Sequence, residues 1–128
     1  MNKFLHRLQS GEILVADGAT GTNLHKMGIQ PGTPPEDLVL DQPELVLQLE
    51  TAFVAAGSDI LLTCTFGGTR LRMKDSKYAL RAAEINLRDV ELARQAASSR
   101  TGVLVAGSIG PAAEIGRASC RERVYLMV

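Results

Sequence analysis

The chain has 128 residues, and its 14 basic and 14 acidic side chains give a formal charge of zero. This length fits one small domain and argues against a multidomain machine. Apolar residues make up 45% and charged residues 22%, an ordinary globular balance that argues against intrinsic disorder. No dense basic block is present, so we expect neither nucleic acid nor an anionic membrane surface as a partner.

Targeting signals and metal motifs are missing from the sequence pattern. No apolar run approaches the roughly 18 residues of a membrane span, and the first residues lack the apolar stretch of a secretory signal. The two cysteines, Cys64 and Cys120, lie 56 positions apart, which matches no metal-binding spacing and gives little reason to expect a disulfide. We therefore expect a cytoplasmic protein.

Three short apolar runs, at 13–16, 59–63 and 103–106, are each followed by clustered glycines. Their apolar residues are consecutive rather than alternating, which is typical of parallel strands buried on both faces. Glycine after such a strand permits a sharp turn or a close approach to a ligand.

Two helical patterns lie between these strands. The first places Leu45, Val46, Leu49, Phe53 and Ala56 on one face and ends at Gly57. The second packs through Leu80, Ala83, Leu87 and Val90, with a Glu84–Arg88 pair on its outer face.

The order strand, helix, strand, helix, strand predicts βα repetition with right-handed crossovers. Residues 28–41 contain three of the five prolines and predict an irregular loop rather than a helix. Arg70 and Arg72 are interpreted as the solvated start of a connection, not as a binding patch.

Parallel sheets bind ligands at the carboxyl ends of their strands, which brings segments 17–22, 63–68 and 107–111 to one face. Together they offer one carboxylate, several hydroxyls, a thiol, an aromatic ring and exposed amides, a mixture that suits a small zwitterion better than a nucleotide. A phosphate-binding loop is disfavoured because neither Gly-Lys-Ser/Thr nor a complete G-x-G-x-x-G occurs, and because Asp17 would repel the phosphate.

Three motifs in this order carry a family resemblance. Asp-Gly-Ala-Thr-Gly-Thr at 17–22, Gly-Ser-Asp-Ile-Leu-Leu-Thr-Cys-Thr-Phe at 57–66 and Gly-Ser-Ile-Gly-Pro at 107–111 resemble the homocysteine S-methyltransferase domain, as in the N-terminal module of cobalamin-dependent methionine synthase. The resemblance spans about residues 11–111. It implies an α/β fold, namely the N-terminal part, about three βα units, of an incomplete (β/α)8 TIM barrel.

The resemblance also implies a binding site for homocysteine. Asp17 and the backbone amides of Gly18 and Ala19 would hold the amino-acid end of the substrate. The pocket lining implied is Thr63, Thr65, Phe66 and, reaching in from the third strand, Ser108. Two alternatives stay open, since Asp17 could cap the following turn and Phe66 could pack inside a barrel.

The resemblance implies a zinc ion, held in the family by three cysteines, that keeps the homocysteine sulfur as a thiolate. Those cysteines belong to Gly-x-Asn-Cys-like and Gly-Gly-Cys-Cys segments, neither of which occurs here. Cys64 is expected to be a buried apolar residue. We therefore assign no catalytic residue and no metal ligand to this chain. Cobalamin and methyltetrahydrofolate would act in other modules of a parent protein, and the methyl donor stays open.

Residues 114–124 read E-I-G-R-A-S-C-R-E-R-V, which matches the translation of a common sequencing adapter at all eleven positions. We therefore predict a partial homocysteine-binding barrel at 1–113 and non-native read-through at 114–128.

The function expected from the sequence is that of a fragment of a zinc-dependent methyltransferase that forms methionine from homocysteine, the fragment itself being inactive. The alternative is a small non-enzymatic α/β module that binds an amino acid or a partner. Another barrel enzyme, such as an aldolase-like lyase, is disfavoured because no lysine ends any of the three strands.

Overall fold

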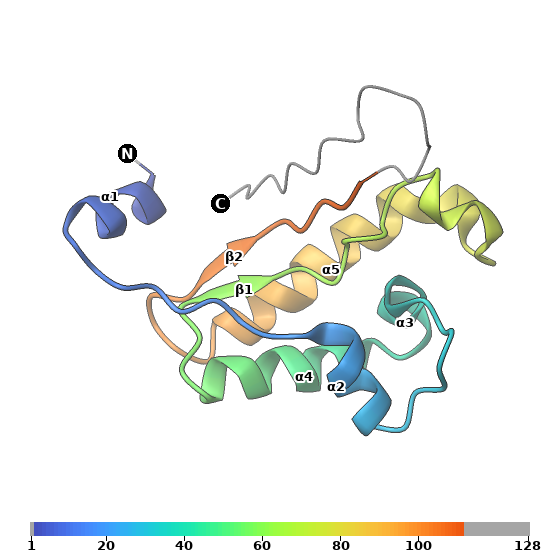
Figure 1. The fold of residues 1–128 in the computed structure, drawn as a ribbon, viewed down its shortest axis with the longest axis horizontal. Coiled ribbons are helices and arrows are strands. Elements are labelled where there is room, and N and C mark those ends of the chain that lie inside the picture. The colour runs from blue at the N-terminus through green and yellow to red at the C-terminus, as the bar shows by residue number, and fades with distance from the viewer. Residues whose placement is uncertain (1, 112–128) are drawn as a thin grey trace.

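The computed structural model describes residues 2–111, so the predicted read-through at 114–128 lies outside the described residues (Figure 1). The described elements, in chain order, are α1 (Lys3–Gln9), α2 (Thr20–Lys26), α3 (Pro35–Asp41), α4 (Pro43–Ala55), β1 (Ile60–Leu62), the 3-10 helices η1 (Arg72–Asp75) and η2 (Ala79–Arg81), α5 (Ala82–Ala97) and β2 (Leu104–Ala106). None of the described helices is long and apolar enough to cross a membrane.

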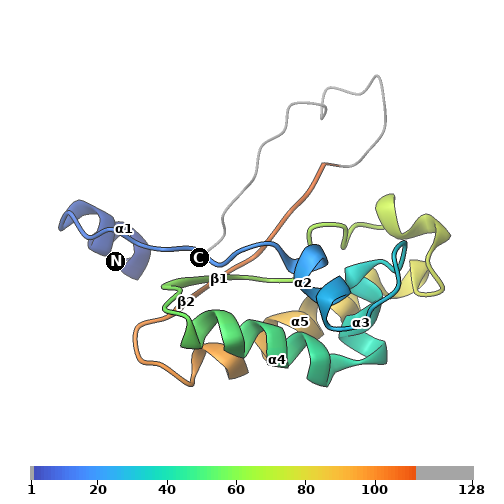
Figure 2. The same cartoon turned by 60° about the horizontal axis from the view of Figure 1, so that its bottom comes forward.

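The sheet consists of two parallel strands, with Ile60, Leu61 and Leu62 of β1 opposite Leu104, Val105 and Ala106 of β2. Both strands were predicted as parallel from their apolar runs, and this is confirmed. Helices α4 and α5 pack together beneath one face of the sheet (Figure 2). Leu61 of β1 is fully buried in a cluster with Val54 of α4 and with Ala93 and Ala96 of α5. The connection from β1 to β2 through α5 is the βα repetition that the sequence predicted.

The prediction of a strand at 13–16 is wrong for the described structure. This segment runs beside β1, but it makes only one isolated parallel bridge, from Ala16 to Ile60. Ile13 is 88% exposed, because no described element covers the outer side of this segment. A continuous apolar run was therefore read as a strand buried on both faces, whereas only Leu14 of this segment is partly buried.

Helix α4 agrees with the prediction except at its end. Val46 and Leu49 of the predicted face are buried, but Ala56 is exposed as the C-cap and Val54 is buried instead. The chain leaves the helix at Gly57 with φ of +108°. A residue with a side chain is strained at that φ, which is why glycine ends the helix there.

The prediction of an irregular loop at 28–41 is wrong at its end, because α3 begins at Pro35. Proline is accepted in the first turn of a helix, where its missing N–H would have had no partner. Leu38 and Val39 of α3 are fully buried in the main core, and their packing stabilises the helix. The nearby prolines led to the prediction of a loop instead.

Helix α5 is rotated relative to the prediction. Leu80 is 98% exposed and Leu87 is 70% exposed, and the helix instead buries Ala82, Ile85, Asp89, Leu92, Ala93 and Ala96. Leu80 precedes the helix, in η2, so it could not set the helical face. The predicted Glu84–Arg88 pair is replaced by Arg81–Glu84 and Arg88–Glu91 ion pairs at 2.7 and 2.9 Å.

Two carboxyl groups are buried where α4 and α5 meet. Glu50 is 4% exposed, and neither of its carboxyl oxygens has a hydrogen-bond partner among the described residues. Burial, followed by the charges of Asp89 and Asp17, raises the pKa of Glu50 to about 9. Burial also raises the pKa of Asp89 to about 7. The backbone N–H of Cys64 donates to Asp89 Oδ2 at 2.5 Å, and this hydrogen bond lowers the pKa and so opposes the effect of burial. Glu50 is therefore neutral at physiological pH.

The rotation of α5 predicts opposite outcomes for two neighbouring apolar residues. Ile85→Ala should lower the free energy of unfolding by about 2–5 kcal/mol, because it leaves a cavity in the core. Leu87→Ala should change it by less than about 0.5 kcal/mol, because its side chain faces solvent. Urea unfolding of both variants measures the difference, and equal losses would show that the packing face is the one read from the sequence.

The buried carboxyl group of Glu50 predicts a dependence of stability on pH. Because its pKa is raised in the folded state, the folded chain binds a proton that the unfolded chain releases, and stability falls as pH rises from about 5 to about 8. Over that range Glu50→Gln should gain about 1–4 kcal/mol in unfolding free energy relative to the wild type. The control is Glu44→Gln at the exposed start of α4, whose stability should parallel the wild type within a few tenths of a kcal/mol. If the unfolding free energy of Glu50→Gln also followed that of the wild type across this pH range, a buried proton on Glu50 would be excluded.

Candidate functional site

Three hydrogen bonds link the carboxyl ends of β1 and β2 in a closed ring. The backbone N–H of Ser108 donates to Thr63 Oγ1 at 2.9 Å, and Thr65 Oγ1 donates to the Ser108 carbonyl at 2.8 Å. The two threonine hydroxyls are 2.7 Å apart. Since the Thr65 proton is committed to Ser108, the Thr63 hydroxyl must donate to Thr65. The ring holds the two loops that follow the strands in one fixed arrangement.

Asp17 joins the first loop to the same strand end. Its backbone N–H donates to the Ile60 carbonyl at 2.9 Å, and its Oδ2 accepts from the backbone N–H of Leu62 at 3.0 Å. Its Oδ1 is buried without a partner among the described residues, and burial raises the pKa of this carboxyl group. The carboxylate of Asp17 thus binds β1, and it does not cap α2, whose first residues receive no side-chain cap.

A cavity of about 290 Å³ opens at this end of the sheet. Its walls come from the loop before α2, the starts of α2 and α3, the end of β1, the loops after β1 and β2, and η1. The lining residues are Gly18, Thr20, Gly21, Pro35, Glu36, Leu62, Thr63, Cys64, Phe66, Arg72 and Ser108. The cavity lies at the strand ends where parallel α/β sheets bind their ligands.

Four of the seven predicted binding residues line this cavity, namely Gly18, Thr63, Phe66 and Ser108. Asp17, Ala19 and Thr65 lie beside it and are absent from its wall. Phe66 is 46% exposed at the cavity.

The cavity has two charged residues that the sequence reasoning missed. Glu36 is buried in the first turn of α3 and accepts a hydrogen bond from the Gly67 backbone N–H at 2.5 Å. Arg72 reaches the cavity from η1, and its guanidinium carbon lies 5.7 Å from the centre of the Phe66 ring, within range of a cation–π contact. Arg72 is exposed in the connection between β1 and α5, as expected, and it also contributes to the wall of the cavity. No motif marks either residue, because both come from connecting segments.

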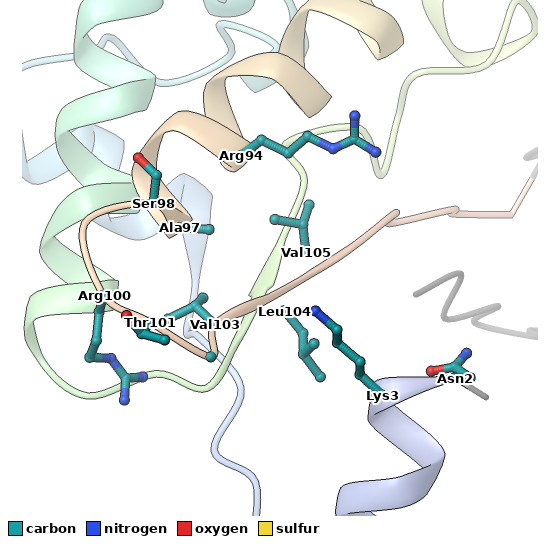
Figure 3. Close-up of a pocket in the computed structure, with 11 residues that line it drawn as sticks. Asn2, Lys3, Arg94, Ala97, Ser98, Arg100, Thr101, Val103, Leu104 and Val105 are labelled. Carbon is teal, nitrogen blue, oxygen red and sulfur yellow. The ribbon is translucent and has the colours of Figure 1, made fainter.

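A larger groove of about 710 Å³ lies at the opposite end of the sheet, where the chain enters β2 (Figure 3). It is bounded by Lys3 of α1, Arg94 and Ala97 of α5, and the residues leading into Val105. Its wall carries three cationic side chains but no carboxylate, thiol or aromatic ring among the lining residues. The smaller cavity therefore offers the more varied chemistry for a ligand.

Residues 2–111 do not fit a zinc site. They contain no group of three histidine, cysteine or acidic side chains placed to hold a metal ion. Cys64 is buried, and burial together with nearby carboxylates raises the pKa of its thiol above the ordinary value. A zinc ligand requires the opposite shift, because zinc binds the thiolate.

Comparison with known proteins agrees with this geometry. A profile of the homocysteine S-methyltransferase family matches residues 14–124. The S-methylmethionine–homocysteine S-methyltransferase BHMT2 of Rattus norvegicus is 37% identical over 106 residues, covering 82% of this chain and 28% of that protein. Betaine–homocysteine S-methyltransferase 1 of Danio rerio is 32% identical over 108 residues, covering 82% and 27%. The chain thus spans less than a third of the length of these relatives.

A solved structure shows the same fold. The metallated form of the homocysteine methyltransferase MmuM from Escherichia coli superposes with a TM-score of 0.75 at 26% identity, covering 86% of this chain and 42% of that one. The two parallel strands and their helices therefore correspond to a part of that protein's barrel, with an incomplete sheet. The profile, the relatives and the fold agree, and the chain belongs to the homocysteine S-methyltransferase family.

Proposed function

We propose that this chain is part of an enzyme that transfers a methyl group to the sulfur of homocysteine and so forms methionine. The observation that carries the proposal is the cavity at the strand ends, which is built from the three loops whose motifs identified the family. A cavity of this size, with hydroxyls, backbone amides and both signs of charge, suits an amino acid.

The roles of the loop residues follow from the resemblance and from their positions. Asp17, with the amides of Gly18 and Ala19, helps hold the amino-acid end of homocysteine. Thr63 and Thr65 fix the loop after β1 through their ring of hydrogen bonds with Ser108, and Phe66 closes one side of the cavity. These residues bind and orient the substrate.

Activation of the sulfur requires a group that the described residues lack. A thiol reacts well only as a thiolate, and in this family we expect zinc, held by cysteines elsewhere in the parent protein, to supply that state. The fragment is therefore proposed to bind substrate without catalysing its methylation.

The relatives suggest which methyl donors should be tested first. S-methylmethionine and betaine, which appear in the names of the relatives, both carry a methyl group on a cationic centre. Methyltetrahydrofolate acting through cobalamin is the donor that the methionine synthase resemblance implies. We propose testing all three on the complete protein.

The boundary at residue 113 also remains a proposal. Amplifying the locus from source DNA should give a coding sequence that departs from the present one after codon 113 and continues to a Gly-Gly-Cys-Cys segment. Finding the codons for 114–124 in the genome would contradict the read-through. An early natural stop would instead favour the alternative function, a non-enzymatic α/β module that binds an amino acid or a partner.

The absence of turnover by the isolated chain is a testable prediction. Purified protein of residues 1–128, given homocysteine, one stoichiometric equivalent of zinc and S-methylmethionine or betaine, should form no methionine above the rate without protein. Chromatographic quantification of methionine measures this, and the complete protein from the amplified locus serves as the positive control. Measurable methionine from the isolated chain would refute the predicted inactivity.

A further inference from the structure

Three carboxyl groups from different elements gather near the end of β1. Among the described residues, every buried side-chain polar atom without a hydrogen-bond partner belongs to Asp17, Glu50 or Asp89, which lie in the loop before α2, in α4 and in α5. The four atoms are Oδ1 of Asp17, both oxygens of Glu50 and Oδ1 of Asp89. Glu50 is 4% exposed and Asp89 is 0% exposed, so bulk solvent does not supply the missing partners.

The two aspartates are bound to alternate residues of one strand end. The Leu62 N–H donates to Asp17 Oδ2 at 3.0 Å, and the Cys64 N–H donates to Asp89 Oδ2 at 2.5 Å. The N–H of Thr63, between them, donates in the other direction, across the sheet to β2. Each aspartate therefore has one oxygen fixed by the strand end, and its second oxygen, Oδ1, still requires a donor.

Glu50 lies near both aspartates but forms a hydrogen bond with neither. The loop that carries Asp17 rests on α4, because a Cβ added to Gly18 would lie 3.2 Å from the Phe53 ring. Phe53 is one helical turn after Glu50, so both side chains lie on the same face of α4. Asp89 comes from α5, which packs along α4, and the charges of Asp89 and Asp17 both act on Glu50. The three groups are thus close together without a direct hydrogen bond among them.

The numbers of donors and acceptors identify what can bridge these groups. An ionised carboxylate only accepts hydrogen bonds, so three adjacent carboxyl groups need at least one proton and a further donor. No cation acts on Glu50, and burial favours its neutral form, so Glu50 carries that proton. A water molecule can accept from one group and donate to two, and buried waters typically make about three hydrogen bonds. A metal ion is disfavoured, because residues 2–111 contain no group of three acidic, histidine or cysteine side chains placed to hold one.

We propose that one buried water accepts a hydrogen bond from protonated Glu50 and donates to Asp17 Oδ1 and Asp89 Oδ1, and that Glu50 thereby acts as a positioning residue for Asp17. The water gives a partner to three of the four oxygens that lack one. It fixes the second oxygen of Asp17, as the Leu62 N–H fixes the first, and so holds the loop before α2 at the edge of the cavity. This inference rests on the proposed function only where it concerns homocysteine, because the bridge itself needs no ligand.

The bridge depends on pH through Glu50. The ionisable groups that face Glu50 are Asp17, Asp89 and the Cys64 thiol, and Glu36 acts on Asp89 and Cys64 from α3. All of them are acids, and burial, followed by the charges of Asp89 and Asp17, raises the pKa of Glu50 to about 9. The proton therefore stays on Glu50 through the neutral range. Above about pH 9 it is lost, and the water then loses its donor and its hold on Asp17 Oδ1.

The test follows the carboxyl carbons of Glu50 and Asp17 by ¹³C NMR across about pH 3–11, using the chain of residues 1–128. In the wild type, the Asp17 carbon should show its own titration and a second shift that coincides with the titration of Glu50 near pH 9. Glu50→Gln keeps an N–H donor and cannot ionise, so it should abolish the second shift and leave the pKa of Asp17 unchanged. Glu50→Leu has no donor, so it should raise the pKa of Asp17 by about one unit. Glu44→Leu, at the exposed start of the same helix, is the matched control and should leave the titration of Asp17 unchanged.

Calorimetry with L-homocysteine under reducing conditions adds a functional measurement. At about pH 8, Glu50→Leu should weaken binding about tenfold, and Glu50→Gln should stay within about twofold of the wild type. If Asp17 titrated alike in the wild type and both Glu50 variants, the positioning role would be overturned, whatever the affinities. If the titrations behaved as expected and the wild type bound no homocysteine, the positioning role would stand and the proposed function would lose its support. Should circular dichroism show that Glu50→Leu does not fold, the second shift of Asp17, present in the wild type and absent from Glu50→Gln, still decides between the outcomes.

Discussion

The hydroxyl of Thr63 is the point on which the arrangement of the cavity depends. It accepts from the backbone of Ser108 and donates to Thr65, which in turn donates to the Ser108 carbonyl, so the ends of β1 and β2 are joined beyond their last paired residues. A hydroxyl can do this because it donates once and accepts as well, whereas an apolar side chain at 63 would leave the partly buried amide of Ser108 without this partner. The loops that carry Phe66 and Ser108 therefore stay beside each other without help from a third strand.

The elements predicted correctly are those whose local sequence agrees with their packing. Helix α4 combines a regular apolar face with glycine at its end, and β1 and β2 are short apolar runs that α4 and α5 cover. The segment 13–16 has the same kind of apolar run, but burial of a strand requires neighbours, and local sequence does not contain them. Proline hid α3 for a related reason, since the burial of Leu38 and Val39 outweighs the local preference for a loop.

In the candidate site, too, one part could be predicted from the sequence and another part could not. Its backbone-rich loops carry motifs, and the sequence placed them together because strands of a parallel sheet end on one side. The charged residues Glu36 and Arg72 come from α3 and η1, connecting segments whose path is set by tertiary packing. A carboxylate hidden among prolines and an arginine in a short polar connection give no periodicity or spacing to detect. Functional side chains that lie in the segments connecting strands and helices are therefore the hardest part of such a site to predict from a single sequence.

The close approach of Gly67 to Glu36 has an evolutionary consequence. A Cβ at position 67 would lie 2.7 Å from Oε1 at the end of the Glu36 side chain, so a larger residue there would require the carboxylate to shift. A larger residue at 67 would therefore change where the acid at 36 lies in the cavity, and a shorter residue at 36 would leave room for a side chain at 67. Members of the family that differ at 36 or 67 would therefore have a cavity of different shape, even where the surrounding motifs are intact.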